Sequence, residues 1–332
     1  MTRRGWLRAF AAAAALLTLG CAGGSLDLGG DHTHGSLPVD ERNPVVLAND
    51  SATDNWTGEY AMLLANSGGP PLAGIIVNPS TYWPDVAANV SGWNQLIAAA
   101  RTSGLRNIPD ATGSAGEPLI RPADGQIEST TPNRSDGGKL ILDLSARLSL
   151  PWRPLVVVTG SRLTEVADAY LMDSTVADRV VVVSALGEAA SNGTAMGWPN
   201  GELDPWADWI VSQRFRYIQV NGYYDQLGDV SSAKAVSLPA NALGTWMGEK
   251  VSKVFQTPMA SDQIGVLAVG VPAFVTGVSR AVTDTSAAFD ATTGPPLTAN
   301  ADGSIWVVSS CDGPTATDRL WKMLADPRTF VH

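Results

Sequence analysis

The stretch that decides the fold runs from Pro44 to Trp56 and reads Pro-Val-Val-Leu-Ala-Asn-Asp-Ser-Ala-Thr-Asp-Asn-Trp. Its first five residues, Pro44–Ala48, form a short apolar run, which predicts a buried strand. The residues after this run are mostly polar, and a helix over residues 58–65 is expected to follow them. In α/β proteins, ligands lie at the carboxyl ends of parallel strands, so this loop is the first place to look for chemistry.

The same alternation continues along the chain. Apolar strands are predicted at residues 44–48, 72–77, 155–159, 180–184 and 217–220, and amphipathic helices at 58–65, 86–103, 163–171, 206–214 and 262–269. Strands that are apolar throughout and alternate with helices indicate a mainly parallel sheet with helices on both faces. We therefore predict an α/β fold with an open Rossmann-like core. Residues 44–332 are expected to form one domain, since no internal repeat or linker interrupts them.

Residues 1–21 are predicted to be a signal peptide. Three arginines precede the apolar run Ala9–Leu19, which is too short to span a bilayer but has the length of a signal core. The start resembles a twin-arginine export signal, although the general route stays open. Leu17–Cys21 resembles a bacterial lipobox, in which Cys21 becomes the lipidated first residue. We expect an exported protein that is lipid-anchored at the cell envelope, with ordinary secretion as the alternative. Residues 22–43, rich in Gly, Asp and His, are expected to be a flexible tether.

The charge and the few histidines disfavour several classes of function. The 332 residues include 32 acidic and 22 basic side chains, for a net charge of -10, and removal of the three arginines in the signal gives -10 - 3 = -13. Such a charge disfavours nucleic-acid binding. His32 and His34 fall in the tether and His332 is the last residue, so a mechanism with a central histidine is disfavoured. Lipidation of Cys21 would leave Cys311 alone, so no disulfide framework is expected.

The loop after the first strand has the donors that a hard divalent cation prefers. Asp50 and Asp54 supply carboxylates and Asn55 an amide, all within six residues, and Ca²⁺ takes several oxygen ligands. The same residue types also serve turns and helix caps, so Thr53 or Asp54 is equally suited to cap the next helix. From the loop alone, the cap is the simpler interpretation.

The wider sequence resembles the inosine-uridine preferring nucleoside hydrolase family. That family opens with a strand, an acidic D-x-D-P-G-x-D-D loop, a helix and a second strand, to which residues 45–77 are similar. The family's third strand with its loop, its L-G-P-L-T-N turn, its N-x-x-x-D-P element and its H-D-P-L-A element are similar to residues 108–122, 159–165, 200–205 and 261–266. No single motif is specific, but the ordered set implies a nucleoside hydrolase-like α/β fold in a divergent, exported member.

The resemblance implies one Ca²⁺ at the bottom of the pocket, where it holds the ribose and the attacking water. Asp50 falls on the carboxylate that binds the metal and acts as general base on that water. Asn55 falls where the family has a second metal-binding aspartate. The backbone carbonyl of Thr164 and the carboxylate of Asp262 would complete the protein ligands. The implied reaction is hydrolysis of the N-glycosidic bond of a ribonucleoside to base and ribose.

The same resemblance implies the substrate contacts. Asp54 falls on the carboxylate that grips the ribose hydroxyls, Asn200 matches an amide that contacts the sugar, and Asp262 would also help to hold the sugar. Trp83 and Trp198 are candidates for stacking on the base, with ordinary packing as the alternative for each. Carboxylates beside the sugar would stabilise the oxocarbenium-like charge that develops as the bond breaks.

Four positions depart from the family pattern. Ala48 replaces the first acid of the loop, Asn55 replaces a charged metal ligand, Trp198 replaces a sugar-binding glutamate, and Ser261 replaces the histidine that helps the base to leave. A second interpretation is therefore a weakened or inactive cell-surface protein that binds a nucleoside or sugar. A solute-binding lipoprotein is a third, but it predicts two similar lobes that the sequence does not show. The preferred base is not determined, and a homo-oligomer is compatible with the sequence.

Overall fold

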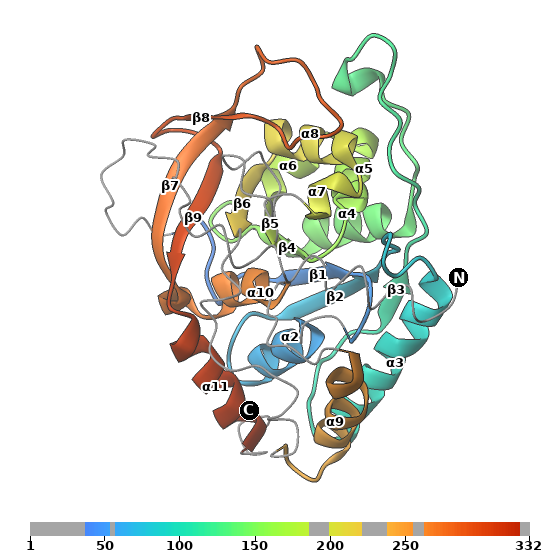
Figure 1. Cartoon of the computed structure of the whole chain (residues 1–332), viewed down its shortest axis with the longest axis vertical. Helices are drawn as coiled ribbons and strands as arrows, with labels where there is room; N and C mark the ends of the chain where they lie inside the picture. Colours follow the sequence, from blue (N-terminus) through green and yellow to red (C-terminus); the bar gives the residue numbers. More distant parts are fainter. Residues whose placement is uncertain (1–36, 54–56, 186–198, 221–237, 255–261, 326–332) are drawn as a thin grey trace, which may run out of the picture.

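The computed structural model describes residues 37–53, 57–185, 199–220, 238–254 and 262–325 (Figure 1). Its elements in chain order are β1 (Val45–Asn49), α2 (Thr57–Asn66), β2 (Leu72–Val77), α3 (Val86–Thr102), β3 (Ala111–Gly113), η1 (Ile127–Ser129), α4 (Asp136–Leu148), β4 (Leu155–Thr159), α5 (Thr164–Met172), α6 (Val176–Arg179), β5 (Val180–Ala185), α7 (Pro199–Glu202), α8 (Pro205–Arg214), β6 (Arg216–Val220), α9 (Ala242–Val254), α10 (Gln263–Gly270), η4 (Pro272–Phe274), β7 (Val275–Thr283), β8 (Leu297–Ala299), β9 (Ile305–Cys311) and α11 (Gly313–Ala325).

The described strands form one nine-stranded sheet in the order β3-β2-β1-β4-β5-β6-β9-β7-β8. Neighbours from β3 through β9 are all parallel. The sheet differs at its β8 edge, where β7 runs antiparallel to both of its neighbours, β9 and β8. Figure 1 shows β7 and β9 as the long orange and red strands at one side of the molecule. The predicted mainly parallel α/β fold is confirmed, and the antiparallel edge is an addition that the sequence pattern did not indicate.

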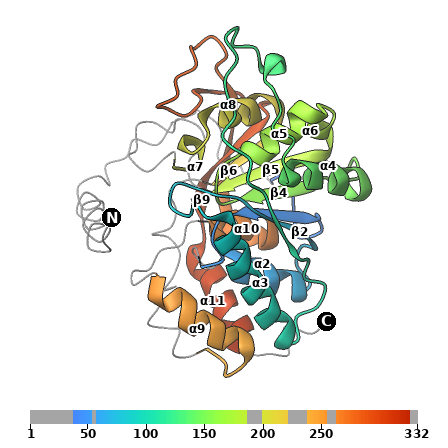
Figure 2. The same cartoon turned by 90° about the vertical axis from the view of Figure 1, so that its right-hand side faces the viewer.

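Helices cover both faces of the sheet. α2, α3, α9, α10 and α11 pack on one face, and α4, α5 and α8 pack on the other (Figure 1). Figure 2 shows α3 and α9 side by side. Every residue of β4 and β5 is buried. In strands covered on both faces, an apolar side chain is stabilising at almost every position. This is why the sequences of β4 and β5 are runs of valine and not an alternation of apolar and polar residues.

The predicted elements agree closely with the observed ones. Residues 72–77 and 155–159 match β2 and β4 residue for residue, and each of the other predicted strands and helices ends within one residue of the observed element. Such differences are within the usual scatter of element boundaries. The helices α4, α9 and α11 and the strands β7, β8 and β9 were not among the predicted elements.

Side-chain caps fix where key helices begin. The carboxylate of Asp85 accepts a hydrogen bond of 3.0 Å from the amide of Ala88 at the start of α3. Asp204 accepts one of 3.0 Å from the amide of Ala207 at the start of α8, and Pro205 follows it at the first helical position. A capped first turn with proline at its start is a strong local signal for a helix. This cap holds the start of α8 at the carboxyl-end side of the sheet.

The last residues assigned to the tether are packed on the domain. Val39 is buried in the core, and the side-chain amide of Asn43 donates to the carbonyl of Pro154 at 2.7 Å. The amide of Val156 donates to the carbonyl of Pro44 at 2.8 Å, which joins the start of β1 to the start of β4. The packed part of the chain therefore begins before residue 44. Cys21 lies outside the described residues, and none of the described helices is long and apolar enough to cross a bilayer.

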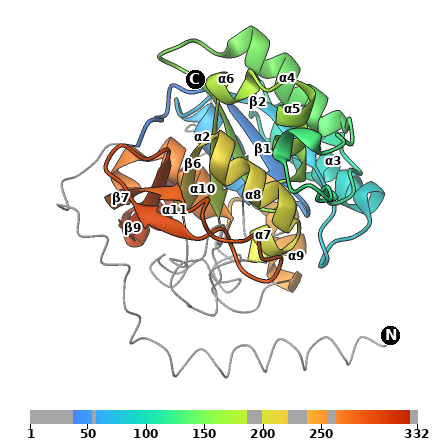
Figure 3. The same ribbon diagram turned by 90° about the horizontal axis from the view of Figure 1, so that it is seen from above.

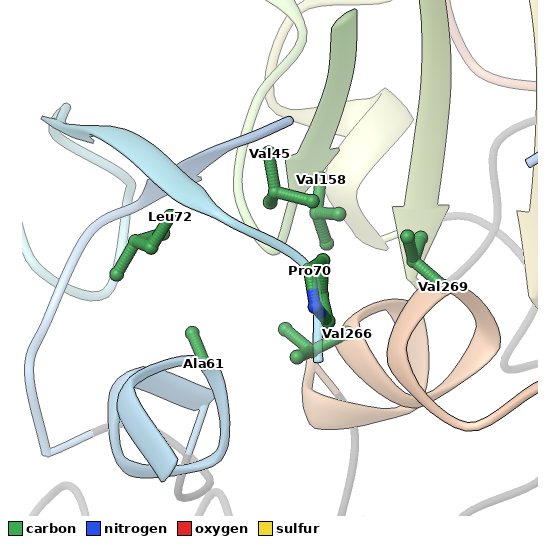
Figure 4. A pocket seen from close by; sticks show the side chains of 7 residues that line it. All are labelled: Val45, Ala61, Pro70, Leu72, Val158, Val266 and Val269. Carbon is green, nitrogen blue, oxygen red and sulfur yellow. The ribbon is translucent and has the colours of Figure 1, made fainter. Parts of the chain in front are cut away.

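One small pocket lies in the core, between the sheet and the helices α2 and α10 that cover one of its faces. Its lining side chains come from β1, α2, β2, β4, α10 and the turn before β2 (Figure 4), and they are Val45, Ala61, Pro70, Leu72, Val158, Val266 and Val269. All of them are apolar, so the pocket offers no group that would orient a polar substrate. It is a gap in core packing, and the chemistry lies elsewhere.

Candidate active site at the carboxyl ends of the strands

Polar side chains gather where β1, β2 and β4 end. Asn49 is the last residue of β1, and Asn78 and Gly160 directly follow the strands on either side of it. The backbone joins these ends, since the amide of Asn78 donates to the carbonyl of Asn49 at 3.1 Å and the amide of Gly160 donates to the carbonyl of Ala48 at 2.9 Å. Parallel pairing thus brings three separate polar loops to one edge of the sheet.

Asp50 is a buried carboxylate at this edge. Its residue is only 4% exposed. The amide of Ser51 donates to Oδ1 at 2.5 Å, and the indole nitrogen of Trp93 donates to the backbone carbonyl of Asp50 at 3.1 Å. Burial raises the pKa of Asp50 to about 6, although hydrogen bonds from Ser80 and Ser51 act against this rise. A carboxylate with a raised pKa is a better proton acceptor near neutral pH.

Asp262 is brought to the same edge from a distant part of the sequence. It precedes α10 and is 2% exposed. The side-chain amide of Asn49 donates to its Oδ2 at 3.3 Å across 213 residues of chain. Gly160 lies so close that a Cβ there would be 2.5 Å from Cγ of Asp262. The predicted partners Asp50 and Asp262 therefore flank Asn49, and the close approach of Asp262 requires glycine at position 160.

Thr164 begins α5 and is fully buried. Its hydroxyl donates to Oδ2 of Asp204 at 2.6 Å, and the amide of Leu119 donates to the same oxygen at 2.9 Å. Because the hydroxyl is engaged in this way, a metal contact from Thr164 would have to use the backbone carbonyl, as the resemblance implies. Asp204 thus joins α5, α8 and the loop after β3.

Asn200 and Trp83 follow strands β5 and β2 and lie at the same end of the sheet. Asn200, in α7, is 6% exposed, and its Nδ2 donates to the carbonyl of Ala185 at 2.5 Å, at the end of β5. Trp83 is half-buried in the loop after β2, where its backbone amide donates a hydrogen bond of 3.0 Å to the hydroxyl of Ser80. The same hydroxyl bonds the carboxylate of Asp50, so the loop that carries Trp83 is joined to the candidate base.

Several predicted site residues lie outside the described residues. They are Asp54, Asn55 and Trp198, together with the substituted position Ser261. Their assignments stay predictions.

A buried polar network beside the site was not predicted. The hydroxyl of Ser161 donates to Oδ1 of Asn78 at 2.5 Å, and Nδ2 of Asn78 donates to the carboxylate of Glu165 at 2.8 Å. All three side chains are buried, and burial raises the pKa of Glu165 while the charge of Arg162 lowers it. The signal was available for Asn78, because it directly follows a predicted strand just as Asp50 follows another. For Ser161 and Glu165 the local sequence indicates only a turn and a helix start.

The donors at this edge fit a hard cation. Asp50, Asp262 and the carbonyl of Thr164 all supply oxygen, which Ca²⁺ prefers. Within the described part of the chain, no three acidic, histidine or cysteine side chains form a metal cluster. A complete coordination shell would therefore need further oxygens from the acidic loop, where the predicted ligand Asn55 lies.

Comparison with known proteins identifies structures of similar fold. No protein-family model and no curated protein matches the sequence. Among solved structures, an inosine-guanosine nucleoside hydrolase matches with a TM-score of 0.61 and 14% identity, over 87% of this chain and 99% of the other. The inosine-uridine preferring nucleoside hydrolase from Bacillus anthracis matches with a TM-score of 0.59 and 13% identity, over 85% and 99%.

The chain has the nucleoside hydrolase fold. The fold is shared with proteins of other descriptions, since the type III effector protein XopQ complexed with adenosine diphosphate ribose matches with a TM-score of 0.55 and 11% identity, over 89% of this chain and 96% of the other. Identities this low establish the fold alone, so the function has to be argued from the site. In this nucleoside hydrolase fold, the described polar residues lie at the carboxyl ends of β1, β2 and β4.

Proposed function

We propose that the protein hydrolyses the N-glycosidic bond of a ribonucleoside and requires Ca²⁺ to do so. The observation that carries this proposal is the buried carboxylate of Asp50 beside the Asn49–Asp262 contact, at the carboxyl end of a central strand. The fold neighbours described as nucleoside hydrolases support the same class of reaction. Asp50, Asn55, Asp262 and the carbonyl of Thr164 would hold the ion.

The roles proposed for these residues follow from the family resemblance, and the surroundings of Asp50 and Asn200 support them. Bound Ca²⁺ would supply the Lewis acidity that makes a water molecule easier to deprotonate. Asp50, held by the amide of Ser51, accepts the proton of the attacking water. Asn200 uses its nitrogen to hold the carbonyl of Ala185, which leaves its side-chain oxygen to accept a sugar hydroxyl. Asp54 and Asp262 bind the remaining sugar hydroxyls, and their negative charge stabilises the oxocarbenium-like sugar.

The leaving base would rely on stacking. Position 261 is serine, so the acid that protonates the base in many similar proteins is replaced. Trp83, joined to Asp50 through Ser80, and Trp198 are the proposed stacking residues, because an aromatic face on a purine raises the basicity of the ring. This favours a purine nucleoside over a pyrimidine one.

We also propose that the protein is exported and anchored through a lipid on Cys21. The support is the sequence alone: an arginine-rich start, a short apolar run and a lipobox-like Leu17–Cys21. Mass spectrometry of the mature amino-terminal peptide tests this directly.

A release assay tests the activity. Purified protein is given a panel of nucleosides with Ca²⁺ or with a chelator, and free base and ribose are measured. We expect release only with Ca²⁺, and a fall of about 10²–10⁴-fold in kcat for Asp50→Asn, since that is the usual contribution of a general base. Asp110→Asn, a change of an exposed aspartate on the loop before β3, is the matched control and should leave turnover unchanged.

Two results would contradict the proposal. Equal turnover by Asp50→Asn would remove Asp50 from the mechanism. Calorimetric binding of a nucleoside without release of base, by a protein that also binds Ca²⁺, would favour the nucleoside-binding protein that the substitutions at Asn55, Trp198 and Ser261 allow.

A further inference from the structure

A tight turn at the end of the molecule opposite the site exposes two large apolar side chains. It spans Leu150–Arg153, closed by backbone hydrogen bonds of 2.9 Å in both directions between Leu150 and Arg153. Trp152, at the tip, is 71% exposed and Leu150 is 41% exposed. Large apolar side chains that protrude together from a turn mark an interaction surface.

The turn also carries positive charge. The guanidinium of Arg153 lies 5.5 Å from the ring centroid of Trp152, in cation–π distance. Arg147, near the end of α4, is exposed and pairs with Asp143 one helical turn earlier. Tryptophan beside arginine is the combination that settles in the headgroup region of a bilayer, where the ring is half-buried and the cation meets anionic lipid.

The amino-terminal segment joins the domain beside this turn. Asn43 hydrogen-bonds the carbonyl of Pro154, the residue after the turn, and Pro44 accepts the amide of Val156. Leu37, where the described chain begins, is only 16 positions after Cys21. Sixteen residues span at most about 55 Å when fully extended. A lipid on Cys21 would therefore keep the domain within reach of a membrane, with the chain entering the domain on the side of this turn.

The site lies at the other end of the strands. The turn immediately precedes β4, whereas Gly160 and Asp262 lie where β4 ends. Figure 3 shows α6 and the start of β1 toward one edge of the molecule and α7, which carries Asn200, toward the opposite edge. A domain that rests on its amino-end turn would direct the site away from the bilayer.

We propose that the Leu150–Arg153 turn is a membrane contact, with Trp152 and Leu150 seated in the headgroup region of the bilayer that holds the lipid of Cys21. This inference rests on the proposed lipid anchor and not on the proposed hydrolysis. A free turn would leave the domain tumbling on its tether. A seated turn gives it one orientation, with the nucleoside site open to the surrounding solvent.

Hydrogen exchange measured by mass spectrometry tests the contact. The full-length lipidated protein is placed in vesicles of phosphatidylcholine with 30% phosphatidylglycerol and compared with the unlipidated full-length variant Cys21→Ser without vesicles. We expect the amides of residues 149–154 to exchange about fivefold more slowly on the vesicles, because water is excluded from the turn. Lipidated Trp152→Ser should lose this protection. Lipidated Ile120→Ser, which changes an 85% exposed residue near the site end, should keep it.

Three results would overturn the contact. Unchanged exchange at residues 149–154 would show that the turn does not contact the membrane. Unchanged protection in Trp152→Ser would show that the indole ring does not insert into the headgroup region. Protection that grows with the protein-to-lipid ratio would indicate a second copy of the chain as the occupant. Nucleoside release by Trp152→Ser should equal that of the unaltered protein, so a failure of the proposed hydrolysis is recognised separately.

Discussion

Replacement of Glu59 by glutamine should make the protein less sensitive to pH. Glu59 lies in the first turn of α2 and is fully buried. Among the residues that the structure describes, neither of its carboxylate oxygens finds a hydrogen-bond partner from another residue. Burial raises its pKa from the ordinary 4.5 to about 8, because the ionised form would lose its hydration, and a hydrogen bond to the residue's own backbone only partly opposes this rise.

The sign of the effect follows from proton binding. Below pH 4.5 the group is protonated in both states and folding is unaffected. Between pH 4.5 and about 8 only the unfolded chain ionises, so the free energy of unfolding falls by about 1.4 kcal/mol for each pH unit. Above that range both states are ionised and the loss is complete. From pH 6 to pH 8 the expected loss is about 2 kcal/mol.

Urea unfolding followed by circular dichroism at pH 6, 7 and 8 measures this loss. The unaltered protein should lose about 2 kcal/mol more over this range than Glu59→Gln, which cannot ionise. Glu117→Gln, which alters an exposed glutamate, is the matched control and should follow the unaltered protein. Parallel pH profiles for Glu59→Gln and the unaltered protein would refute the reasoning, because they would mean that the buried group has the same pKa in both states.

The remaining predictions concern three other positions. Gly160→Ala places a Cβ 2.5 Å from Cγ of Asp262, and such a displacement should lower kcat/KM about 100-fold. In the matched change Gly92→Ala, the new Cβ meets nothing closer than 3.8 Å, so kcat/KM should be unaltered. Asp204→Ala removes a helix cap and two further hydrogen bonds, which should cost about 3 kcal/mol in urea unfolding, and a loss below about 1 kcal/mol would contradict this role. Burial raises the pKa of Cys311 to about 12, so little reactive thiolate forms at pH 8. Iodoacetamide should therefore label Cys311 at least about 100-fold more slowly in the folded than in the unfolded protein. Peptide mass spectrometry would measure the two rates.

The sequence by itself determined the central part of the fold. Leu155–Val158 and Val180–Val183 are apolar at every position, which is typical of strands covered on both faces. The helical spacing of apolar residues between these strands then placed the helices to within one residue. The strand-end position of the acidic loop marked it as a place to look for ligands, and the resemblance to the nucleoside hydrolase family singled out Asp50 within it.

The tertiary structure decided the rest. The strand β7 has a glycine and an arginine within it and is only partly buried, so its short-range pattern is weak. Asp262 meets Asn49 across 213 residues, and the Asn78–Ser161–Glu165 network joins three elements. Hydrophobic periodicity reports only on neighbours along the chain. Contacts between distant residues depend on the order of strands in the sheet and on which helix packs where, and these are set by the whole core at once.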